Sequence, residues 1–268
     1  MDNNKKTALI TGATSGIGEE FARRFGKLGY DLIITGRREN KMKIVADEIK
    51  KESNVKVDII IVELSDEKEL ENLIKVIENK RIDILVNNAG FGVSNFYDKE
   101  HIENFINMEI VHVKVPMRIT YTVLKGMIER NDGVVINVSS ESAFLPMPQN
   151  TVYASTKAFL KIFTEGLNLE VKARGKNIKF QALCPGFTKT DFHEKMGIEK
   201  SSQVDRGIIK WRTPKYIVNY SLKMLKKDKV ICVPGIENRI LIRLLSLLPK
   251  KNYEKLMVNF CRKSLKVK

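Results

Sequence analysis

The sequence predicts a doubly wound α/β fold: a parallel β-sheet with helices on both faces, in a single domain with a helical C-terminal extension. Two observations carry this prediction. Short apolar runs rich in β-branched residues alternate with amphipathic segments, as is typical of strands that are buried on both faces of a parallel sheet. No internal repeat or low-complexity linker interrupts the alternation, which favours one domain.

The individual elements follow from this alternation. We expect strands at 7–10, 31–35, 57–62, 82–87, 133–139, 178–184 and 230–234. The helical segments between them cover 17–28, 39–52, 66–79, 101–129, 153–173 and 214–227. The stretch "SDEKE" at 65–69 indicates a helix start, with Ser65 as the cap and acidic residues in the first turn. Parallel strands of this kind are joined by right-handed crossovers.

Composition excludes several classes of protein. The 268 residues are 43% hydrophobic and 29% charged, which permits a sizeable core and argues against wholesale disorder. No run reaches the roughly 18 apolar residues of a membrane span, and the first residues lack the apolar region of a secretory peptide. Three scattered cysteines suggest neither a disulfide framework nor a metal site. We expect a cytoplasmic protein.

The positive charge is concentrated at one end of the chain. Of the net charge of +15, the residues from Lys195 onward carry +14, with 19 Lys or Arg against 5 Asp or Glu. An anionic substrate, a membrane surface or an acidic partner would explain this excess, and so would a solvated lysine-rich surface. Nucleic acid is disfavoured, because no recognised motif or aromatic interleaving accompanies the charge.

A glycine-rich turn, "TGATSGIG" at 11–18, follows the first strand. Its glycines permit a tight turn and close approach to a pyrophosphate at a helix N-terminus, which makes the fold Rossmann-type. An ordinary tight turn is the alternative, but the strand–turn–helix context supports a nucleotide site. After the second strand, Arg37 and Arg38 replace the carboxylate that selects NAD. Guanidiniums suit a 2′-phosphate, so NADP(H) is favoured over a plain surface pair.

The stretch "VYASTK" at 152–157 places Tyr153 and Lys157 four residues apart, on one face of a helix. A nearby ammonium favours the phenolate and lowers the pKa of a tyrosine. Such a pair arises by chance in many proteins, so its meaning depends on its surroundings. Ser140 precedes Tyr153 by thirteen residues.

Together with "NNAG" (87–90) and "PGFTKT" (185–190), these motifs resemble the short-chain dehydrogenase/reductase family, in order from about residue 5 to 190. The resemblance implies an NADP(H)-dependent oxidoreductase that transfers a hydride between the nicotinamide and a carbonyl or secondary alcohol. Tyr153 would donate the proton, and Lys157 and the positive nicotinamide ring would lower its pKa. Ser140 would bind the carbonyl oxygen. Lys157 would also hold the nicotinamide ribose.

The resemblance also implies a set of cofactor contacts. Asn87 and Gly90 would lie beside the adenosine, and Glu63 stands where the family usually has Asp. The cofactor-binding residues that we expect are Gly12, Ser15, Gly16, Ile17, Gly18, Arg37, Arg38, Glu63, Leu64, Asn88, Ala89, Gly90, Tyr153, Lys157, Pro185, Gly186 and Thr188.

One residue departs from the family pattern. His112 stands where the family usually carries an asparagine, whose backbone helps to bind a water that links the lysine to solvent. His112 is either an alternative proton relay, since imidazole titrates near pH 6.5, or a tolerated substitution. We favour the second and keep His112 as a catalytic candidate. The departure is also the sole sequence support for an alternative function, an NADPH-binding sensor or scaffold with little or no turnover.

The region after residue 190 loses the family pattern. We expect a substrate lid at about 188–212, a catalytic domain over 1–236 and a basic helical extension over 237–268. In "ENRILIRLLSLLPKKNYEKL" (237–256), Arg239, Arg243 and Ser246 form a polar stripe on an Ile- and Leu-rich helix. This helix would lie on an anionic membrane surface, cover a lipophilic substrate, pack in a subunit interface or cover the core.

Substrate and assembly follow from the resemblance as well. The C-terminal region resembles relatives that act on steroids or acyl chains, so we expect a hydrophobic substrate. Family members commonly pair through their two long helices, here about 101–129 and 153–173, so a homodimer or homotetramer is expected.

Overall fold

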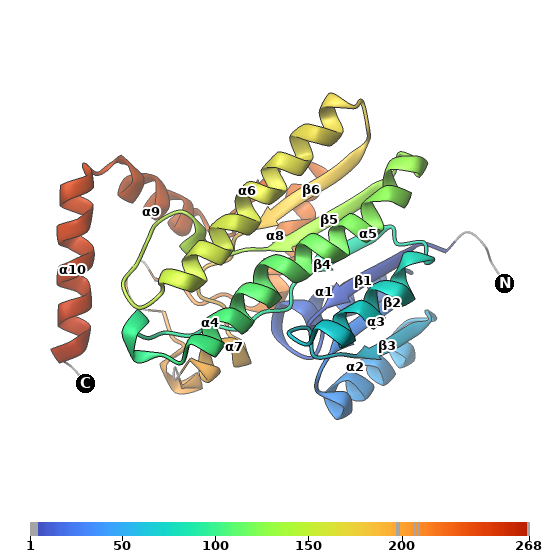
Figure 1. Ribbon diagram of the computed structural model, residues 1–268, viewed down its shortest axis with the longest axis horizontal. Coiled ribbons are helices and arrows are strands. Elements are labelled where there is room, and N and C mark those ends of the chain that lie inside the picture. The colour runs from blue at the N-terminus through green and yellow to red at the C-terminus, as the bar shows by residue number, and fades with distance from the viewer. Residues whose placement is uncertain (1–4, 197–198, 206, 208, 267–268) are drawn as a thin grey trace.

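A computed structural model describes residues 5–196, 199–205, 207 and 209–266. Residues 197, 198, 206 and 208 of the expected lid, and 267–268 of the expected extension, lie outside this description. The described residues form a seven-stranded sheet in the order β3-β2-β1-β4-β5-β6-β7 (Figure 1). The strands are β1 (Thr7–Thr11), β2 (Asp31–Gly36), β3 (Val57–Ile61), β4 (Ile84–Asn87), β5 (Gly133–Val138), β6 (Ile178–Leu183) and β7 (Ile231–Cys232).

All neighbouring strands are parallel, and the strand order reverses at β1, which pairs with both β2 and β4. In open α/β sheets, ligands bind beyond the carboxyl ends of the strands at such a reversal. A ligand site is therefore expected at the residues that follow β1, β2, β4 and β5. The predicted fold class is confirmed.

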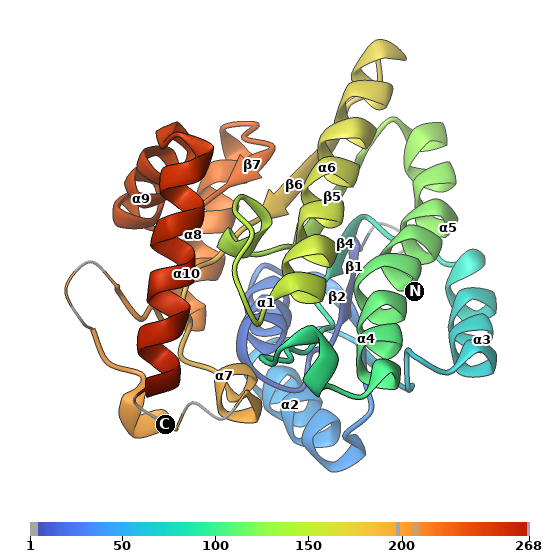
Figure 2. The same cartoon turned by 60° about the vertical axis from the view of Figure 1, so that its left-hand side comes forward.

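Helices cover both faces of the sheet (Figures 1 and 2). On one face, Phe21, Met42 and Ile217 represent a core formed with α1, α2 and α8. On the other, Leu73, Ile119 and Val171 represent a core formed with α3, α5 and α6. The helices are α1 (Gly16–Lys27), α2 (Glu39–Glu52), α3 (Glu67–Glu78), α4 (Ile102–Glu109), α5 (Val115–Arg130), α6 (Thr151–Ala173), α7 (Asp191–Lys195), α8 (Pro214–Lys226), α9 (Ile236–Leu247) and α10 (Lys250–Lys266).

Three details differ from the sequence prediction. The long helix expected over 101–129 is interrupted by a π-helical turn, η2 (Ile110–Lys114), which contains His112. The helical extension expected over 237–268 consists of two helices divided at Pro249, because proline cannot continue the backbone hydrogen-bond ladder. The cap of α3 is Asp66 and not Ser65, since the Asp66 carboxylate accepts the hydrogen bond from the Glu69 backbone N–H.

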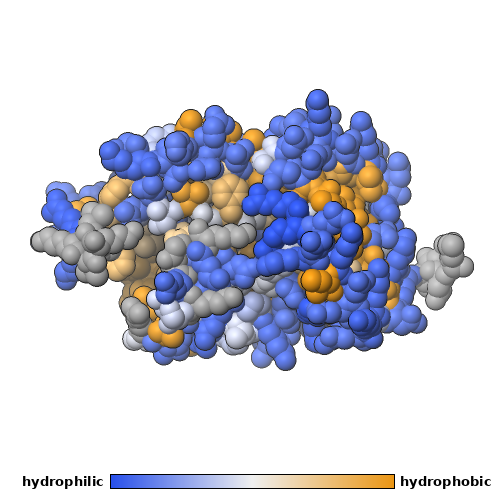
Figure 3. All heavy atoms as spheres, turned by 90° about the horizontal axis from the view of Figure 1, so that it is seen from below, coloured by the Kyte–Doolittle hydropathy of each residue, from blue (hydrophilic) through white to orange (hydrophobic). Residues whose placement is uncertain are grey.

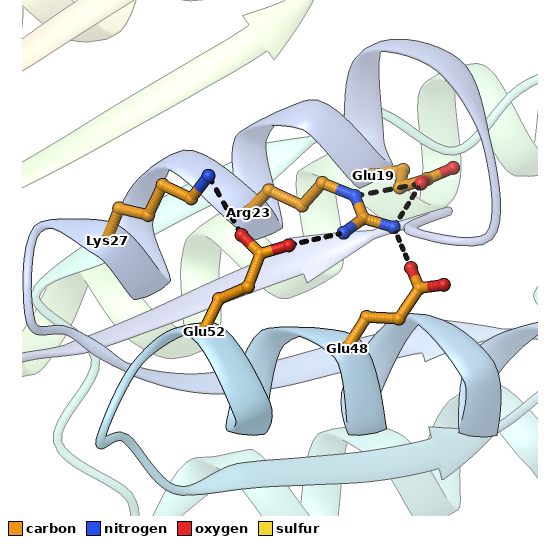
Figure 4. A network of polar contacts seen from close by, with 5 residues as sticks. All are labelled: Glu19, Arg23, Lys27, Glu48 and Glu52. Carbon is orange, nitrogen blue, oxygen red and sulfur yellow. Dashed lines mark hydrogen bonds and ion pairs between the residues drawn. The ribbon is translucent and has the colours of Figure 1, made fainter.

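An ion-pair network fixes α1 against α2 (Figure 4). The guanidinium of Arg23 contacts Glu19 on its own helix at 2.9 Å, and Glu48 and Glu52 on α2. Lys27 extends the network to Glu52 at 2.8 Å. Exposed pairs of this kind are individually weak, but the network joins the helix that follows the glycine-rich turn to the helix that follows Arg38. It therefore helps to hold the two parts of the expected nucleotide site together.

The last two helices lie beyond the layered core (Figures 1 and 2). Tyr253 of α10 donates a hydrogen bond to the Pro146 carbonyl at 2.6 Å, in the segment between β5 and α6. Among the described residues, no helix has the length and apolarity that crossing a membrane requires. The surface seen in Figure 3 is mostly hydrophilic, with smaller hydrophobic patches. The predicted boundary at residue 236 stays a prediction.

Candidate active site

The turn after β1 is held tightly against the end of β4. Gly12 has a φ of +68° and Gly16 a φ of +62°, which glycine adopts at little cost. A side-chain carbon on Gly12 would lie 2.8 Å from the backbone of Ala89. The Asn88 amide donates to the carbonyls of Thr11 and Gly12, both at 3.0 Å. The glycines therefore let two strand ends meet, and Asn88 joins them.

The N-terminus of α1 has no side-chain cap. Ser15 occupies the cap position, but its hydroxyl makes no cap hydrogen bond and instead accepts one from Arg38 at 2.8 Å. Arg38 also donates to the Thr14 hydroxyl. Beside them lies a cavity of about 640 Å³, lined in part by Thr14, Ser15, Lys41 and Asp191. Free helix N–H groups beside a guanidinium and two hydroxyls suit a phosphate, so the residues fit a phosphorylated nucleotide.

The two predicted arginines have different surroundings. Arg37 is largely exposed and pairs with Glu63 at 2.8 Å. Burial raises the pKa of Glu63, but hydrogen bonds from Arg37 and Ser65 outweigh it and hold that pKa below its ordinary value. The next residue, Leu64, is buried in the core of the α3 face, so its backbone rather than its side chain is available to a ligand.

The predicted catalytic residues meet at the carboxyl end of β5. Lys157 of α6 is buried, and its ammonium donates to the Val138 carbonyl at 3.0 Å. The hydroxyl of Ser139, the residue after Val138, donates to the Lys157 backbone carbonyl at 2.7 Å. The Lys157 ammonium lies 5.6 Å from the centre of the Tyr153 ring, and Ser140 lies close enough to the Tyr153 phenol to lower its pKa. The helix and the strand end therefore hold the serine, tyrosine and lysine together.

Burial decides the acidity of these groups. It raises the pKa of Tyr153 to about 12, and Ser140 opposes the rise only in part. Burial also lowers the pKa of Lys157 to about 8. Desolvation of the phenolate therefore sets the pKa of Tyr153 among the protein's own groups, and the lowering expected from Lys157 together with the nicotinamide ring stays a prediction.

His112 lies fully buried in the π-helical turn, with both ring nitrogens engaged. Its Nε2 accepts the Phe91 backbone N–H at 3.1 Å, which places the proton on Nδ1, 2.9 Å from the Thr156 hydroxyl. That hydroxyl donates to the Tyr153 carbonyl at 2.9 Å. Burial, and then the Lys157 charge, hold the pKa of His112 well below its ordinary value. This geometry favours the tolerated substitution over the proton relay.

His112 also constrains the loop after β4. A side-chain carbon on Gly90 would lie 2.6 Å from the His112 Nε2. Asn87, by contrast, points into the core, where it donates to Thr120 at 3.1 Å and to Asn137 at 2.8 Å. Asn87 therefore links β4 to α5 and β5 rather than facing a ligand, while the chain from Asn88 to Gly90 lines the edge of the sheet.

The turn after β6 lies against the segment that carries Ser140. The Pro185 carbonyl accepts the Glu141 backbone N–H at 3.0 Å. A side-chain carbon on Gly186 would lie 2.6 Å from a Glu141 carboxylate oxygen and from the Asn238 amide nitrogen. Burial, and then the charge of Glu237, raise the pKa of Glu141 to about 7. The expected cofactor turn is thus packed tightly between Glu141 and the start of α9.

The expected lid is closed at its base and lies beside the tyrosine. Thr188 and Arg212 form an isolated parallel bridge, at the two ends of the segment predicted as a lid. Within it, the Phe192 ring lies 5.8 Å from the Tyr153 ring. His193 lies among Phe187, Phe192 and Trp211, and burial lowers its pKa to about 4. Uncharged aromatic rings therefore form a wall next to the catalytic residues.

Comparison with known proteins agrees with this geometry. The family model described as short chain dehydrogenase matches residues 6–201. The chain belongs to this family. Members of this family are oxidoreductases that act on CH–OH and C=O groups with a nicotinamide cofactor.

Individual relatives define the likeness further. A very-long-chain 3-oxoacyl-CoA reductase of Rattus norvegicus is 35% identical over 187 residues, which are 68% of this chain and 59% of that protein. The chain thus spans about three-fifths of the length of this relative. An uncharacterized oxidoreductase of Staphylococcus epidermidis is 27% identical over 221 residues, covering 80% of this chain and 94% of that protein. A short-chain dehydrogenase from Sphingobium yanoikuyae in complex with NADPH has a TM-score of 0.80 at 25% identity and covers 98% of this chain and 95% of that one.

Sequence reasoning missed four residues of this short-chain dehydrogenase site. Thr14 lies within the glycine motif but was not predicted to bind the cofactor. Its hydroxyl, next to that of Ser15, could have indicated such a role. The Asp191 carboxylate lies 3.5 Å from the Lys41 ammonium and 3.4 Å from the Arg38 guanidinium. Lys41 and Asp191 are 150 residues apart in the sequence. Glu141 could have been recognised from the sequence, because it is a carboxylate directly after Ser140.

Proposed function

We propose that the protein is an NADP(H)-dependent reductase or dehydrogenase whose substrate is a hydrophobic ketone or the corresponding secondary alcohol. The observation that carries the proposal is the joining of Tyr153, Ser140 and Lys157 at the end of β5, beside the aromatic wall of the lid.

Each residue has a role that its surroundings support. The bound nicotinamide would supply or accept the hydride. Tyr153 would donate its proton to the substrate oxygen in the reductive direction, and the same phenol would accept it in oxidation. Ser140, which lies beside that phenol, would donate to the oxygen as negative charge develops. Lys157, with a pKa of about 8, still carries charge at neutral pH and would favour the phenolate.

The preference for NADP(H) over NAD(H) rests on the site around Arg38. Its guanidinium donates to two hydroxyls and lies next to Lys41, so a 2′-phosphate would meet two cations and two hydroxyls. The first two residues after β2 are arginines, and neither offers the carboxylate that selects NAD. The NADPH complex of the relative from Sphingobium yanoikuyae agrees with this preference.

The substrate class rests on the lid and on the relatives. Phe187, Phe192, His193 and Trp211 are uncharged near neutral pH and favour an apolar substrate. The relatives named very-long-chain 3-oxoacyl-CoA reductases make a ketone on an acyl chain our first choice. A sensor or scaffold with little turnover has no support in this geometry, because all three catalytic side chains are in place.

Assembly and location complete the proposal. The outer faces of α5 and α6 expose Met117, Tyr121, Ile162 and Leu169, and helices that expose large apolar side chains are suited to pairing. We expect a homodimer or homotetramer formed through these faces. A cytoplasmic location agrees with the free thiols of Cys184 and Cys232.

The test is NADPH oxidation that depends on an added carbonyl, measured with diketones, quinones, aldehydes, ketosteroids and β-ketoacyl thioesters. Tyr153→Phe is the matched control, because it removes one hydroxyl and leaves the ring. We expect turnover with an apolar ketone that vanishes in the variant. Turnover that survives in the variant would refute the role of Tyr153, and tight NADPH binding without any turnover would favour the sensor.

A further inference from the structure

The outward face of α9 exposes a row of large aliphatic side chains. Ile236, Ile240, Leu244 and Leu247 are 64%, 48%, 58% and 73% exposed, and Leu248 extends the row. At 100° per residue these side chains fall within one third of the helix circumference. The opposite face packs inward through Leu241, Ile242 and Leu245, which are half-buried. The helix is therefore apolar on two sides, and only one of them covers the protein.

Basic residues border this apolar row. On α9, Arg243 lies next to the row and Arg239 lies one turn before it, with its guanidinium over the Tyr220 ring at 5.9 Å. The break at Pro249 leads directly into exposed Lys250 and Lys251. From Ile236 to Lys266, eight Lys or Arg stand against two Asp or Glu.

The second helix of the pair continues the same pattern. The inward face of α10 consists of half-buried Tyr253 and Met257 and buried Cys261, at intervals of four residues. At the border of this face, Leu256 and Phe260 are exposed, at 44% and 58%. Both helices stand outside the layered core (Figures 1 and 2). The outward residues of α9 and α10, named here the C-terminal face, thus combine exposed apolar side chains with a basic border.

We propose that the C-terminal face docks on an anionic lipid bilayer. A helix with an apolar row and flanking Lys or Arg lies in the membrane interface, where the row enters the acyl boundary and the cations meet anionic headgroups. A second copy of this chain is disfavoured as the partner, because it would bring two basic faces together. The outer faces of α5 and α6, with exposed Met117, Tyr121, Ile162 and Leu169, offer a separate route to pairing.

The docked face would adjoin the substrate lid. At the start of α9, Glu237 pairs with Arg212 at 2.6 Å, and Arg212 forms the base of the lid. Tyr253 of α10 contacts the Pro146 carbonyl in the segment between Ser140 and Tyr153. A bilayer beneath the C-terminal face would therefore lie close to the lid. The docking itself needs neither cofactor nor turnover, so its test stands apart from the proposed function.

The experiment is co-sedimentation of the full chain with vesicles of phosphatidylcholine alone, and with vesicles containing 30% phosphatidylglycerol. We expect binding to the anionic vesicles to be at least about tenfold stronger and to weaken with added salt. The variant I240S/L244S/L247S should lose at least about tenfold of this binding at low salt. The variant R243Q/K250Q/K251Q should reduce it and flatten the salt dependence.

Matched controls keep the test sharp. L28S/V76S/I102S removes three aliphatic side chains of similar exposure elsewhere, and K50Q/K51Q/K75Q removes three exposed charges from α2 and α3. Both should bind as the wild type does. NADPH binding and the thermal midpoint, measured on every variant, show that each one folds.

Four results would overturn the proposal. The first is equal affinity of the wild type for neutral and anionic vesicles, and the second is an equal loss in the control variants. The third is an oligomer that I240S/L244S/L247S dissociates in gel filtration while vesicles remain unbound. This third result would assign the face to a second copy. Capture of an acidic soluble protein in place of vesicles would likewise assign it to that class of partner.

Discussion

The catalytic region and the nucleotide region lie at the same edge of the sheet, but their charged groups differ in exposure to water. Around Tyr153 and Lys157, the polar groups are shielded from water, and desolvation decides each pKa. Around Arg38, the charges are partly exposed and paired with one another across α1, α2 and α7. Buried groups respond strongly when one partner changes, whereas exposed pairs respond weakly. Substitutions in the first region should therefore have the larger effects.

The strongest test of this comparison is Tyr153→Phe. Loss of the phenol removes the proton donor and leaves the ring packing against His112 and Phe192 in place. We expect turnover to fall by at least about 10³-fold, within the range of general acid catalysis. NADPH affinity, measured by fluorescence titration, should stay within about twofold because the nucleotide region is unchanged.

Substitution of each of the two arginines compares two positions within the nucleotide region. Arg38→Ala removes hydrogen bonds to Thr14 and Ser15 and a cation at the proposed phosphate site. We expect NADPH to bind about 10- to 100-fold more weakly, the scale of a charge-assisted hydrogen bond, with NADH little affected. Arg37→Ala should cost NADPH less than about threefold, because Arg37 is exposed and pairs with Glu63. Equal losses for NADPH and NADH would remove the phosphate assignment.

Glu141 extends the comparison to pH and stability. Its pKa is raised from 4.5 to about 7, first by burial and then by Glu237, so the folded protein holds this proton more tightly than the unfolded chain. The stabilisation is fully present below about pH 4.5 and is lost as the pH rises through 7. Glu141→Gln mimics the protonated form. We expect the variant to be more stable than the wild type by about 1–3 kcal/mol at pH 8.

Urea unfolding at two pH values checks this prediction. At pH 5 the wild type already holds most of the proton, so the stabilities of the variant and the wild type should agree within about 0.5–1 kcal/mol. A variant that is less stable at pH 8 would mean that the carboxylate, rather than the acid, is the form that the fold stabilises. Glu237→Gln is the matched control for the neighbouring charge, and it should lower the pKa of Glu141.

His112→Asn probes a buried group that acts through its position. The shorter amide would not keep the contacts with both the Phe91 N–H and the Thr156 hydroxyl. Since neither contact touches a reacting atom, we expect kcat/KM within about tenfold of the wild type, or roughly 1.4 kcal/mol. The pH profile should keep its shape. A loss far above tenfold, or a missing limb in the profile, would show that the imidazole moves a proton.

The sequence predicted the sheet well because buried parallel strands must be apolar. Each of the seven predicted strands overlaps an observed one, and β1, β2, β3, β5 and β6 agree within one residue at each end. The motifs also named Ser140, Tyr153 and Lys157, which the fold brings together. Strand ends and helix starts carry such residues at fixed spacings, so local sequence is enough to propose them.

What the sequence could not predict depends on tertiary context. The rise in the pKa of Tyr153 comes from burial that no spacing reveals. The π-helical turn at His112 and the tight fit of Gly90 against its ring depend on contacts between distant segments. The exposed row on α9 has the same pattern as a core-covering helix, because periodicity cannot tell which apolar face lies outward.

Asp191 lies outside every motif from which the cofactor site was predicted. Its substitution gives the smallest effect that we expect on cofactor affinity. Its carboxylate lies 3.4 Å from Arg38 and 3.5 Å from Lys41, the two cations assigned to the 2′-phosphate. An anionic phosphate would compete with it for both. Asp191→Asn removes the competing charge and keeps the shape. We therefore expect NADPH to bind about threefold more tightly, the scale of an exposed ion pair, and NADH to be unchanged.

Titrations of both cofactors at low and high salt would decide the matter, because screening weakens an exposed pair. The gain for NADPH should shrink as salt is added. Weaker NADPH binding in the variant would reverse the interpretation: Asp191 would then hold Arg38 and Lys41 in place for the phosphate rather than compete with it. Either sign would show that α7, at the start of the lid, responds to the phosphate that distinguishes the two cofactors.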